Sequence, residues 1–230
     1  MNTLHEHFYR DLIAEVEQVS RLIELNANSV IMYIYSIVIN SDITLNALMS
    51  IKKYHIDSYR HSIRVGIYGL TVSSYLRIDS ITLIDICLAC LLHDIGKTKI
   101  PVSLLDKQGK LTDSEFDVMK THSTYSGHIL NYLGYNNTIK WLAIHHSEKP
   151  LGGGYPSGYR NTQIHSQILA VCDIFDALTS KRAYKQPYDI ARSIEIIQEE
   201  GFRGDIINVF ITLSKSEVKN TGEEIQMFNR

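Results

Sequence analysis

The sequence predicts an all-α protein, and two observations support this fold class. Apolar residues recur at spacings of three and four along most of the chain, as in residues 4–25 and Ile164–Thr179, which is the period of amphipathic helices. No strand pair, internal repeat or low-complexity tract stands out in the sequence. Helices are therefore expected to form the whole hydrophobic core.

The N-terminal part is expected to be helical on both sides of a short break. Residues 4–25 carry apolar residues on one face and charges on the other, and Asn26–Ser29 interrupts this pattern with helix-capping residues. Val30–Ile39 is rich in β-branched residues and could be a strand on propensity alone. We interpret it as a buried helix, because helical patterns flank it and no second strand is available to pair with it.

The helical pattern continues through the rest of the chain. One apolar stripe runs from Leu45 to Tyr75, and Ile81–Leu92 is apolar nearly all round, which predicts a central, buried helix. Thr112 and Glu115 have the spacing of a capping box, which predicts the start of another helix. The other expected elements are a loop from Pro101 to Lys110, a turn over residues 131–137, a helix over Ile139–His146, a glycine-rich loop over Ser147–Thr162 and helices over Ile164–Thr179 and Ile190–Glu200.

Length and composition exclude several classes of protein. A chain of 230 residues with 44% apolar residues is long enough for one domain with a substantial core. Its net charge of −2 argues against the broad basic surface that duplex nucleic acid requires. The apolar stretch Val30–Ile39 is half as long as the roughly 20 residues that span a membrane, and the polar N-terminus does not have the pattern of a signal peptide.

Cysteine usage points to a reducing compartment. Three cysteines leave at least one unpaired within the chain, so no disulfide framework is expected. Cys87 and Cys90 lie three apart in the expected buried helix. We interpret them as small core residues rather than as a redox or metal-binding pair.

Histidine is the unusual residue of this composition, with ten copies. Asp57 and His61 are four apart and share one face of an expected helix. His93 and Asp94 follow the most apolar helix, where two ionisable groups are costly to bury unless they are paired or bind a metal. The candidate ligands are five imidazoles and three carboxylates from separate helices: Asp57, His61, His93, Asp94, His122, His145, His146 and Asp173.

This set of ligands suggests a hydrolytic metal centre. Imidazole and carboxylate without thiolate suit iron, manganese, zinc or similar ions. Eight ligands are too many for one ion, whereas two ions about 3.5–4 Å apart can activate water and neutralise charge on a phosphoryl group. A single histidine such as His61 is more often a surface or satisfied core residue, so the prediction depends on the conjunction of all eight.

Five motifs resemble the HD-GYP family, a branch of the HD phosphohydrolase superfamily, over roughly Leu45–Phe210. They are HDIGK at His93–Lys97, LLDKQGKLTDSEFDVMKTH ending at His122, HHSE at His145–Glu148, GGGYP at Gly152–Pro156 and CDIFDALTSKRAYK at Cys172–Lys185. The resemblance implies an HD-domain helical bundle and a phosphodiesterase that opens cyclic di-GMP to pGpG and often GMP. It also implies a bacterial, cytoplasmic setting and two or three divalent ions, commonly iron or manganese.

The resemblance also assigns roles to individual residues. All eight candidate ligands fall on metal positions of the family, but Asp57 stands where members with three metals carry glutamate, so two ions are the safer expectation. Asp94 and Lys97 are expected to be catalytic, with Lys97 stabilising charge at the scissile phosphate. Tyr155, Arg182 and Lys185 are the other expected substrate contacts, since cations suit the two phosphates of a cyclic dinucleotide.

The loop after His146 departs from the family pattern. Ser147 separates the histidines from Glu148, the loop is one residue longer, and Leu151 replaces an aspartate. The choice of dinucleotide therefore stays open between cyclic di-GMP and another such as cyclic GMP-AMP. A catalytically silent module that binds dinucleotides or docks proteins is a third hypothesis, which the complete ligand set argues against.

The expected organisation is an N-terminal helical extension over residues 1–44, a phosphohydrolase domain over 45–213 and a C-terminal tail over 214–230. The extension mixes Glu with Arg on its polar face, so packing on the core is favoured over binding to a membrane surface. A homodimer or a regulatory protein could also be contacted through this helix or through the loop that carries Tyr155.

Overall fold

The computed structural model describes residues 3–181 and 186–215, and in these ranges it is helical with no β-strand. The predicted all-α fold class is therefore confirmed. The elements in chain order are α1 (Thr3–Val19), α2 (Ala27–Ile39), α3 (Asp42–Tyr54), α4 (Ile56–Tyr75), α5 (Ser80–Leu92), the 3-10 helix η1 (Ile95–Lys99), α6 (Val102–Leu105), α7 (Asp113–Tyr132), α8 (Asn137–His145), α9 (Ile164–Thr179), α10 (Ile190–Glu199) and α11 (Gly204–Leu213).

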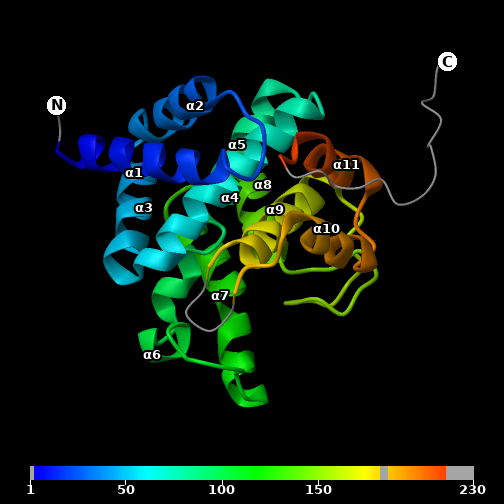
Figure 1. Cartoon of the computed structure of the whole chain (residues 1–230). Helices are drawn as coiled ribbons and strands as arrows, with labels where there is room; N and C mark the ends of the chain where they lie inside the picture. Colours follow the sequence, from blue (N-terminus) through cyan, green and yellow to red (C-terminus); the bar gives the residue numbers. More distant parts are fainter. Residues whose placement is uncertain (1–2, 182–185, 216–230) are drawn as a thin grey trace.

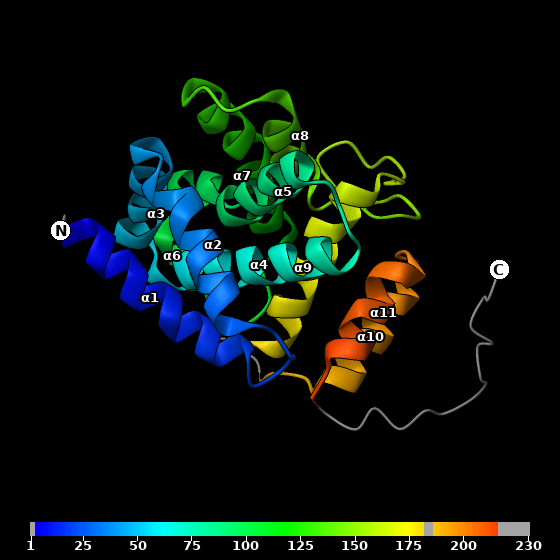
Figure 2. The same cartoon turned by 90° about the horizontal axis from the view of Figure 1, so that it is seen from above.

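Helix α4 lies at the centre of the fold. It packs against α1, α3, α5 and α9, and the two views show α1, α2 and α3 on one side of it and the pair α10 and α11 on another (Figures 1 and 2). Helices α7 and α8 pack against each other and meet the centre through η1 and α5. The ends of α5 and α8, the second turn of α4 and the middle of α7 and α9 thereby come to one region.

The first helix is shorter than predicted. It ends at Val19, whereas the sequence pattern predicts a helix to residue 25. The backbone of Glu24 instead donates to Leu213 at 2.6 Å, and Lys215 donates to Leu22 at 3.0 Å, so Ile23 forms an isolated antiparallel bridge with Ser214. Hydrogen bonds to a distant segment thus replace the last helical turns.

The interpretation of the β-branched segment as a helix is confirmed, but the segment is not buried all round. Asn26 caps α2 by accepting a hydrogen bond from the Ser29 backbone at 3.1 Å. Only Val30, Ile34 and Val38 are fully buried, which is the spacing of a single helix face.

The stripe from Leu45 to Tyr75 belongs to two helices that meet at His55. The His55 backbone donates to Ile51 at 2.8 Å and so closes α3, while its ring nitrogen accepts from the Ser58 backbone at 3.1 Å and caps α4. One residue therefore ends one helix and starts the next.

The other predicted elements occur close to their expected bounds. The capping box is present, with hydrogen bonds between Thr112 and Glu115 at 2.7 and 3.3 Å. Helix α5 is largely buried, although Ile81 at its start is 78% exposed, and its two cysteines are buried and free as expected. The segment from Pro101 contains the short helix α6 in addition to the expected loop.

Among the described residues no single helix is long and apolar enough to cross a membrane; α2 and α3 pass such a test only as a pair, and they meet at a bend of 103°. The proposed division of the chain stays a prediction. Its boundary at residue 44 lies in the first turn of α3, and the described part of the predicted tail is Ser214 and Lys215.

Gly96 allows η1 to approach α7, and replacing it with alanine tests this packing. Its backbone donates to the Ser126 hydroxyl at 2.9 Å, and a methyl group on Gly96 would overlap with the carbonyl oxygen of His122. We expect Gly96→Ala to lower the free energy of unfolding by about 2 kcal/mol or more, because the two segments would have to move apart. Chemical denaturation measures this change.

Gly204→Ala is the matched control, because a methyl group there meets no atom within 4 Å. Alanine also has the higher helix propensity, so this variant is expected to be as stable as the parent or slightly more stable. Equal stability of the two variants would contradict the close approach of η1 and α7.

Candidate metal centre

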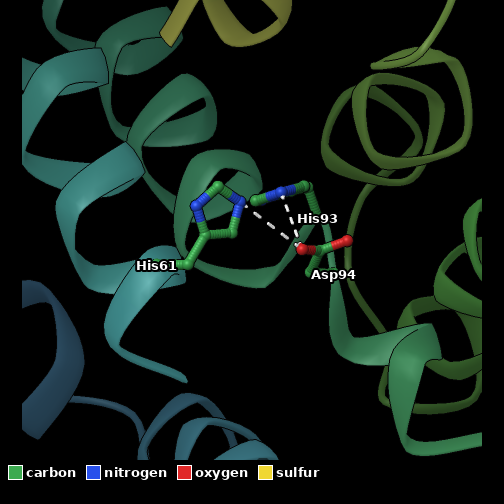
Figure 3. Close-up of side chains that lie close together, drawn as sticks. All are labelled: His61, His93 and Asp94. Atoms are coloured by element: carbon green, nitrogen blue, oxygen red, sulfur yellow. Dashed lines mark ion pairs between the residues drawn. The ribbon is translucent and has the colours of Figure 1, made fainter. Parts of the chain in front are cut away.

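Six of the predicted ligands come together at the convergence of the helices. His61 lies in the second turn of α4, His93 ends α5, and Asp94 precedes η1. Figure 3 shows the His61 and His93 rings directed at the same Asp94 carboxylate. His122 comes from α7, His146 ends α8, and Asp173 lies inside α9.

These six side chains form three overlapping groups of possible metal ligands. The groups are His61–His93–Asp94, His93–His146–Asp173 and Asp94–His122–His146, and within each group the ligand atoms lie within 4.8 Å of one another.

Asp94 connects two of these groups through its two oxygens. Oδ2 lies 3.5 Å from Nε2 of His61 and 3.3 Å from Nε2 of His93, whereas Oδ1 lies 3.3 Å from Nε2 of His122. Nε2 of His146 in turn lies 3.2 Å from Nε2 of His122. Asp94 can therefore contribute one oxygen to each of two sets of candidate ligands.

The backbone fixes three of the rings in a ligand-competent orientation. Nδ1 of His93, His122 and His146 donates to the carbonyl three residues earlier at 2.8, 2.7 and 2.8 Å, respectively. Since a carbonyl can only accept, Nδ1 carries the proton and Nε2 keeps its lone pair for a metal. Nε2 of His93 and Oδ1 of Asp94 are buried and have no hydrogen-bond partner among the described residues, which fits atoms that serve as ligands.

The electrostatics of the group also suit a divalent ion. Burial and the neighbouring His93 and His122 lower the pKa of His146 to about 3, and burial lowers the pKa of His122 as well. Although burial opposes ionisation, the neighbouring histidines hold the pKa values of Asp94 and Asp173 well below their usual range. The shifts of His122 and His146 favour the neutral imidazoles that metal binding needs. Although burial opposes its charge, the pKa of His93 is instead raised by the nearby Asp94 and Asp173.

Two predicted ligands lie outside the three groups. Asp57 is exposed in the first turn of α4. Nδ1 of His145 lies 3.9 Å from Oε1 of Glu148, and its ring packs 4.9 Å from the Trp141 ring and 5.3 Å from the Tyr159 ring. Successive residues on a helix point about 100° apart, so His145 and His146 face different surroundings. Ligand roles for Asp57 and His145 remain predictions.

The predicted substrate contacts are placed only in part. Nζ of Lys97 donates to Oδ2 of Asp94 at 2.5 Å, next to the ligand groups. The Tyr155 ring lies 6.1 Å from the His122 ring and 6.0 Å from the Phe116 ring, and burial raises the pKa of Tyr155 to about 12. Arg182 and Lys185 lie outside the residues that the structure describes.

The unusual loop after His146 is anchored from within by a buried carboxylate. Oε1 of Glu148 accepts hydrogen bonds from the Ser157 and Gly158 backbones at 2.6 and 3.0 Å. Leu151, which replaces the expected aspartate, is 67% exposed and packs beside Gly201. Glu148 thus anchors the longer loop from within, and Leu151 exposes an apolar side chain at the position where the family pattern has an aspartate.

Sequence reasoning did not assign the residues that support His61 from behind. Nδ1 of His61 donates to Oδ2 of Asp176 at 2.7 Å, and Arg64 donates to both oxygens of Asp176 at 2.6 and 3.0 Å. Although burial opposes ionisation, His61 and Arg64 lower the pKa of Asp176 to about 2. The spacing of Asp176 from the candidate ligand Asp173 was a usable signal for this role, because residues three apart on a helix are neighbours.

Asp176→Asn tests this ion pair through the pH dependence of stability. The folded protein lowers the pKa of Asp176 from 3.8 to about 2, so ionised Asp176 stabilises the fold above pH 4 by about 2 kcal/mol. This contribution is lost as the pH falls through 2, with about half of it gone near pH 3. We expect the difference in free energy of unfolding between metal-free parent and variant to shrink from pH 6 to pH 3. A pH-independent difference would contradict this assignment.

Comparison with known proteins supports the expected family. The profile of the HD domain family matches residues 44–205. A cyclic di-GMP phosphodiesterase from Thermotoga maritima is 34% identical over 74% of this chain and 49% of that protein. A 3'3'-cGAMP-specific phosphodiesterase from Vibrio cholerae is 36% identical over 60% of this chain and 31% of that protein. The chain therefore spans half or less of the length of these curated relatives.

A solved structure shows the same fold at low sequence identity. An HDG"Y"P protein from Bdellovibrio bacteriovorus superposes with a TM-score of 0.58 at 15% identity, over 90% of this chain and 69% of that one. The family and the buried His/Asp groups together indicate divalent metal binding. The predicted resemblance to HD-GYP proteins is confirmed, and the chain belongs to the HD domain family.

Proposed function

We propose that this protein is a divalent-metal-dependent phosphodiesterase that hydrolyses cyclic di-GMP to pGpG, GMP or both. The observation that carries the proposal is Asp94, whose Oδ2 faces His61 and His93 while its Oδ1 faces His122. The substrate class is supported by two relatives from different bacteria whose names describe them as cyclic dinucleotide phosphodiesterases. A cytoplasmic role in second-messenger signalling is part of this proposal.

The ligands divide between two ions. One ion would be held by His61, His93 and Asp173, and the other ion by His122 and His146. Asp94 would contribute one oxygen to each ion. Divalent ions bound there supply positive charge to the phosphoryl oxygens and lower the pKa of water. Iron or manganese is the proposed metal, because both accept mixed imidazole and carboxylate ligands.

Lys97 is the proposed cation at the scissile phosphate. Its ammonium group already touches Asp94, and its side chain is 21% exposed, so it can reach both the metal centre and an incoming ligand. A lysine in this position stabilises negative charge that develops on the phosphoryl oxygens. Tyr155, Arg182 and Lys185 are proposed to contact the rest of the dinucleotide.

Cyclic GMP-AMP is the second candidate substrate. A relative named as a 3'3'-cGAMP-specific phosphodiesterase supports it. The altered loop, in which exposed Leu151 replaces an acid and Glu148 is engaged with the loop backbone, leaves this choice open. A catalytically silent module is disfavoured, because six ligand side chains converge and the backbone orients three of their rings.

Hydrolysis assays with His93→Ala test the proposed activity. Protein prepared without oxygen and loaded with Fe(II) or Mn(II) is expected to hydrolyse cyclic di-GMP, and the variant is expected to lose about 10²-fold or more of this activity because a metal ligand is missing. Chromatography of the products distinguishes pGpG from GMP, and parallel assays with cyclic GMP-AMP determine the preferred substrate. Absence of turnover of either dinucleotide by metal-loaded protein would refute the enzymatic proposal.

His145 and His146 are a matched pair for testing the ligand set. His146 lies in the candidate ligand groups and His145 does not, so His146→Ala is expected to weaken Mn(II) binding by 10-fold or more, on the order of the loss of a metal-supporting group. His145→Ala is expected to weaken it less. Calorimetric titration of metal-free protein with Mn(II) measures both, and equal losses would place His145 among the ligands.

A further inference from the structure

A glutamate of the N-terminal helix is buried where an apolar residue is expected. Glu15 lies in α1 among Leu12, Val16 and Val19, which are buried, and is itself only 6% exposed. A carboxylate costs free energy to bury unless it is paired and hydrogen-bonded. Its position on the inner face of α1 therefore calls for a partner from the helices beneath.

That partner is Arg64, which is shared between two carboxylates. Nη1 of Arg64 donates to Oε2 of Glu15 at 2.7 Å, while Nε and Nη2 donate to Asp176 at 2.6 and 3.0 Å. Although burial opposes the charge, Asp176 and Glu15 raise the pKa of Arg64. The guanidinium thus joins α1 to α9 through α4, with a separate edge of its planar group directed at each acid.

The hydrogen-bond chain ends on a candidate metal ligand. Oδ2 of Asp176 accepts from Nδ1 of His61 at 2.7 Å, and Nε2 of His61 lies 3.0 Å from Asp173 and 3.5 Å from Asp94. A carboxylate behind a ligating histidine fixes its orientation and raises its basicity. Each link from Glu15 to His61 is buried.

We propose that Glu15 is a positioning residue of the metal centre and acts through Arg64 and Asp176 on His61. This inference builds on the proposed metal-dependent function and adds the N-terminal helix to it. Glu15 holds the guanidinium in the orientation that fits Asp176, and its negative charge offsets Arg64. Without Glu15, Arg64 is held less firmly in this orientation. In addition, its positive charge then acts on Asp176 alone, so that the Asp176 carboxylate supports His61 less. Both effects weaken metal binding at His61.

Mn(II) binding to Glu15 variants tests the proposal without an activity assay. Removing a residue that supports a ligand, as Asp176 supports His61, typically costs 10- to 100-fold in metal affinity, and Glu15 acts two links further away, through Arg64 and Asp176. We expect Glu15→Gln, which keeps an acceptor but removes the charge, to raise the Kd for Mn(II) roughly threefold. Glu15→Met, which removes both, is expected to raise it about tenfold. Electron paramagnetic resonance of free Mn(II) measures the Kd of the 230-residue chain.

The Kd values of the Glu15 variants are interpreted by comparison with three other variants. Glu17→Gln removes an exposed charge two residues away on the same helix and is expected to leave the Kd unchanged. Asp176→Asn is expected to weaken binding more than either Glu15 variant, and combining it with Glu15→Gln should add little, because both act through one path. His93→Ala removes a proposed ligand and tests the metal centre itself.

The outcomes separate the inference from the proposed function. A lower melting temperature of metal-free Glu15→Gln and Glu15→Met with an unchanged Kd would mean that Glu15 only packs α1 on α4, and would overturn the inference alone. A parent protein that binds no Mn(II), or a His93→Ala variant that binds it as well as the parent, would overturn the proposed metal centre and the inference with it. If Glu15→Gln does not fold, Glu15→Met provides the same comparison.

Discussion

The burial of the Asp94 carboxylate is the constraint on which the rest of the structure depends. Its side chain is 1% exposed, and an isolated ionised carboxylate in such surroundings is strongly disfavoured. The fold compensates by directing His61, His93 and His122 at its oxygens and by placing Lys97 beside it. The helices that carry these side chains must therefore meet at one point. The close contact of η1 with α7 at Gly96 is one consequence of this requirement.

The same constraint gives α4 its central place. This helix carries His61 toward the candidate metals and Arg64, one turn later, toward the carboxylates of α1 and α9. The N-terminal helix contributes apolar side chains to the common core and a buried charge to the network behind the site. The N-terminal helix therefore packs on the common helical core, which is the arrangement that the composition of its polar face favours.

Local patterns predicted the helices and most of the site, and long-range contacts account for the remainder. The pair His93–Asp94 was recognisable because ionisable residues follow an apolar helix, and the capping box at Thr112 was recognisable because its spacing is local. The end of α1 could not be predicted from the local pattern, because it depends on backbone hydrogen bonds between residues 22–24 and residues 213–215. The divergence of His145 from His146 depends on how the end of α8 is rotated relative to the cluster. The role of Glu15 could not be predicted, because its partner Arg64 lies on another helix.

In the proposed phosphodiesterase, selectivity among cyclic dinucleotides would have to come from the surroundings of the metal centre rather than from the metal ligands. Cyclic di-GMP and cyclic GMP-AMP present the same kind of phosphodiester to the reacting centre and differ in the edges of one base. In the proposed reaction the imidazoles, the carboxylates and Lys97 would act on phosphate and water, so they would not distinguish the two bases. A base edge is distinguished by hydrogen bonds that one base satisfies and the other leaves unpaired. The loop held by Glu148, with Tyr155 against His122 and Leu151 exposed, is the part of the described site whose sequence departs from the family. The physical basis for any change of substrate is therefore expected in this loop, while the chemistry at Asp94 stays the same.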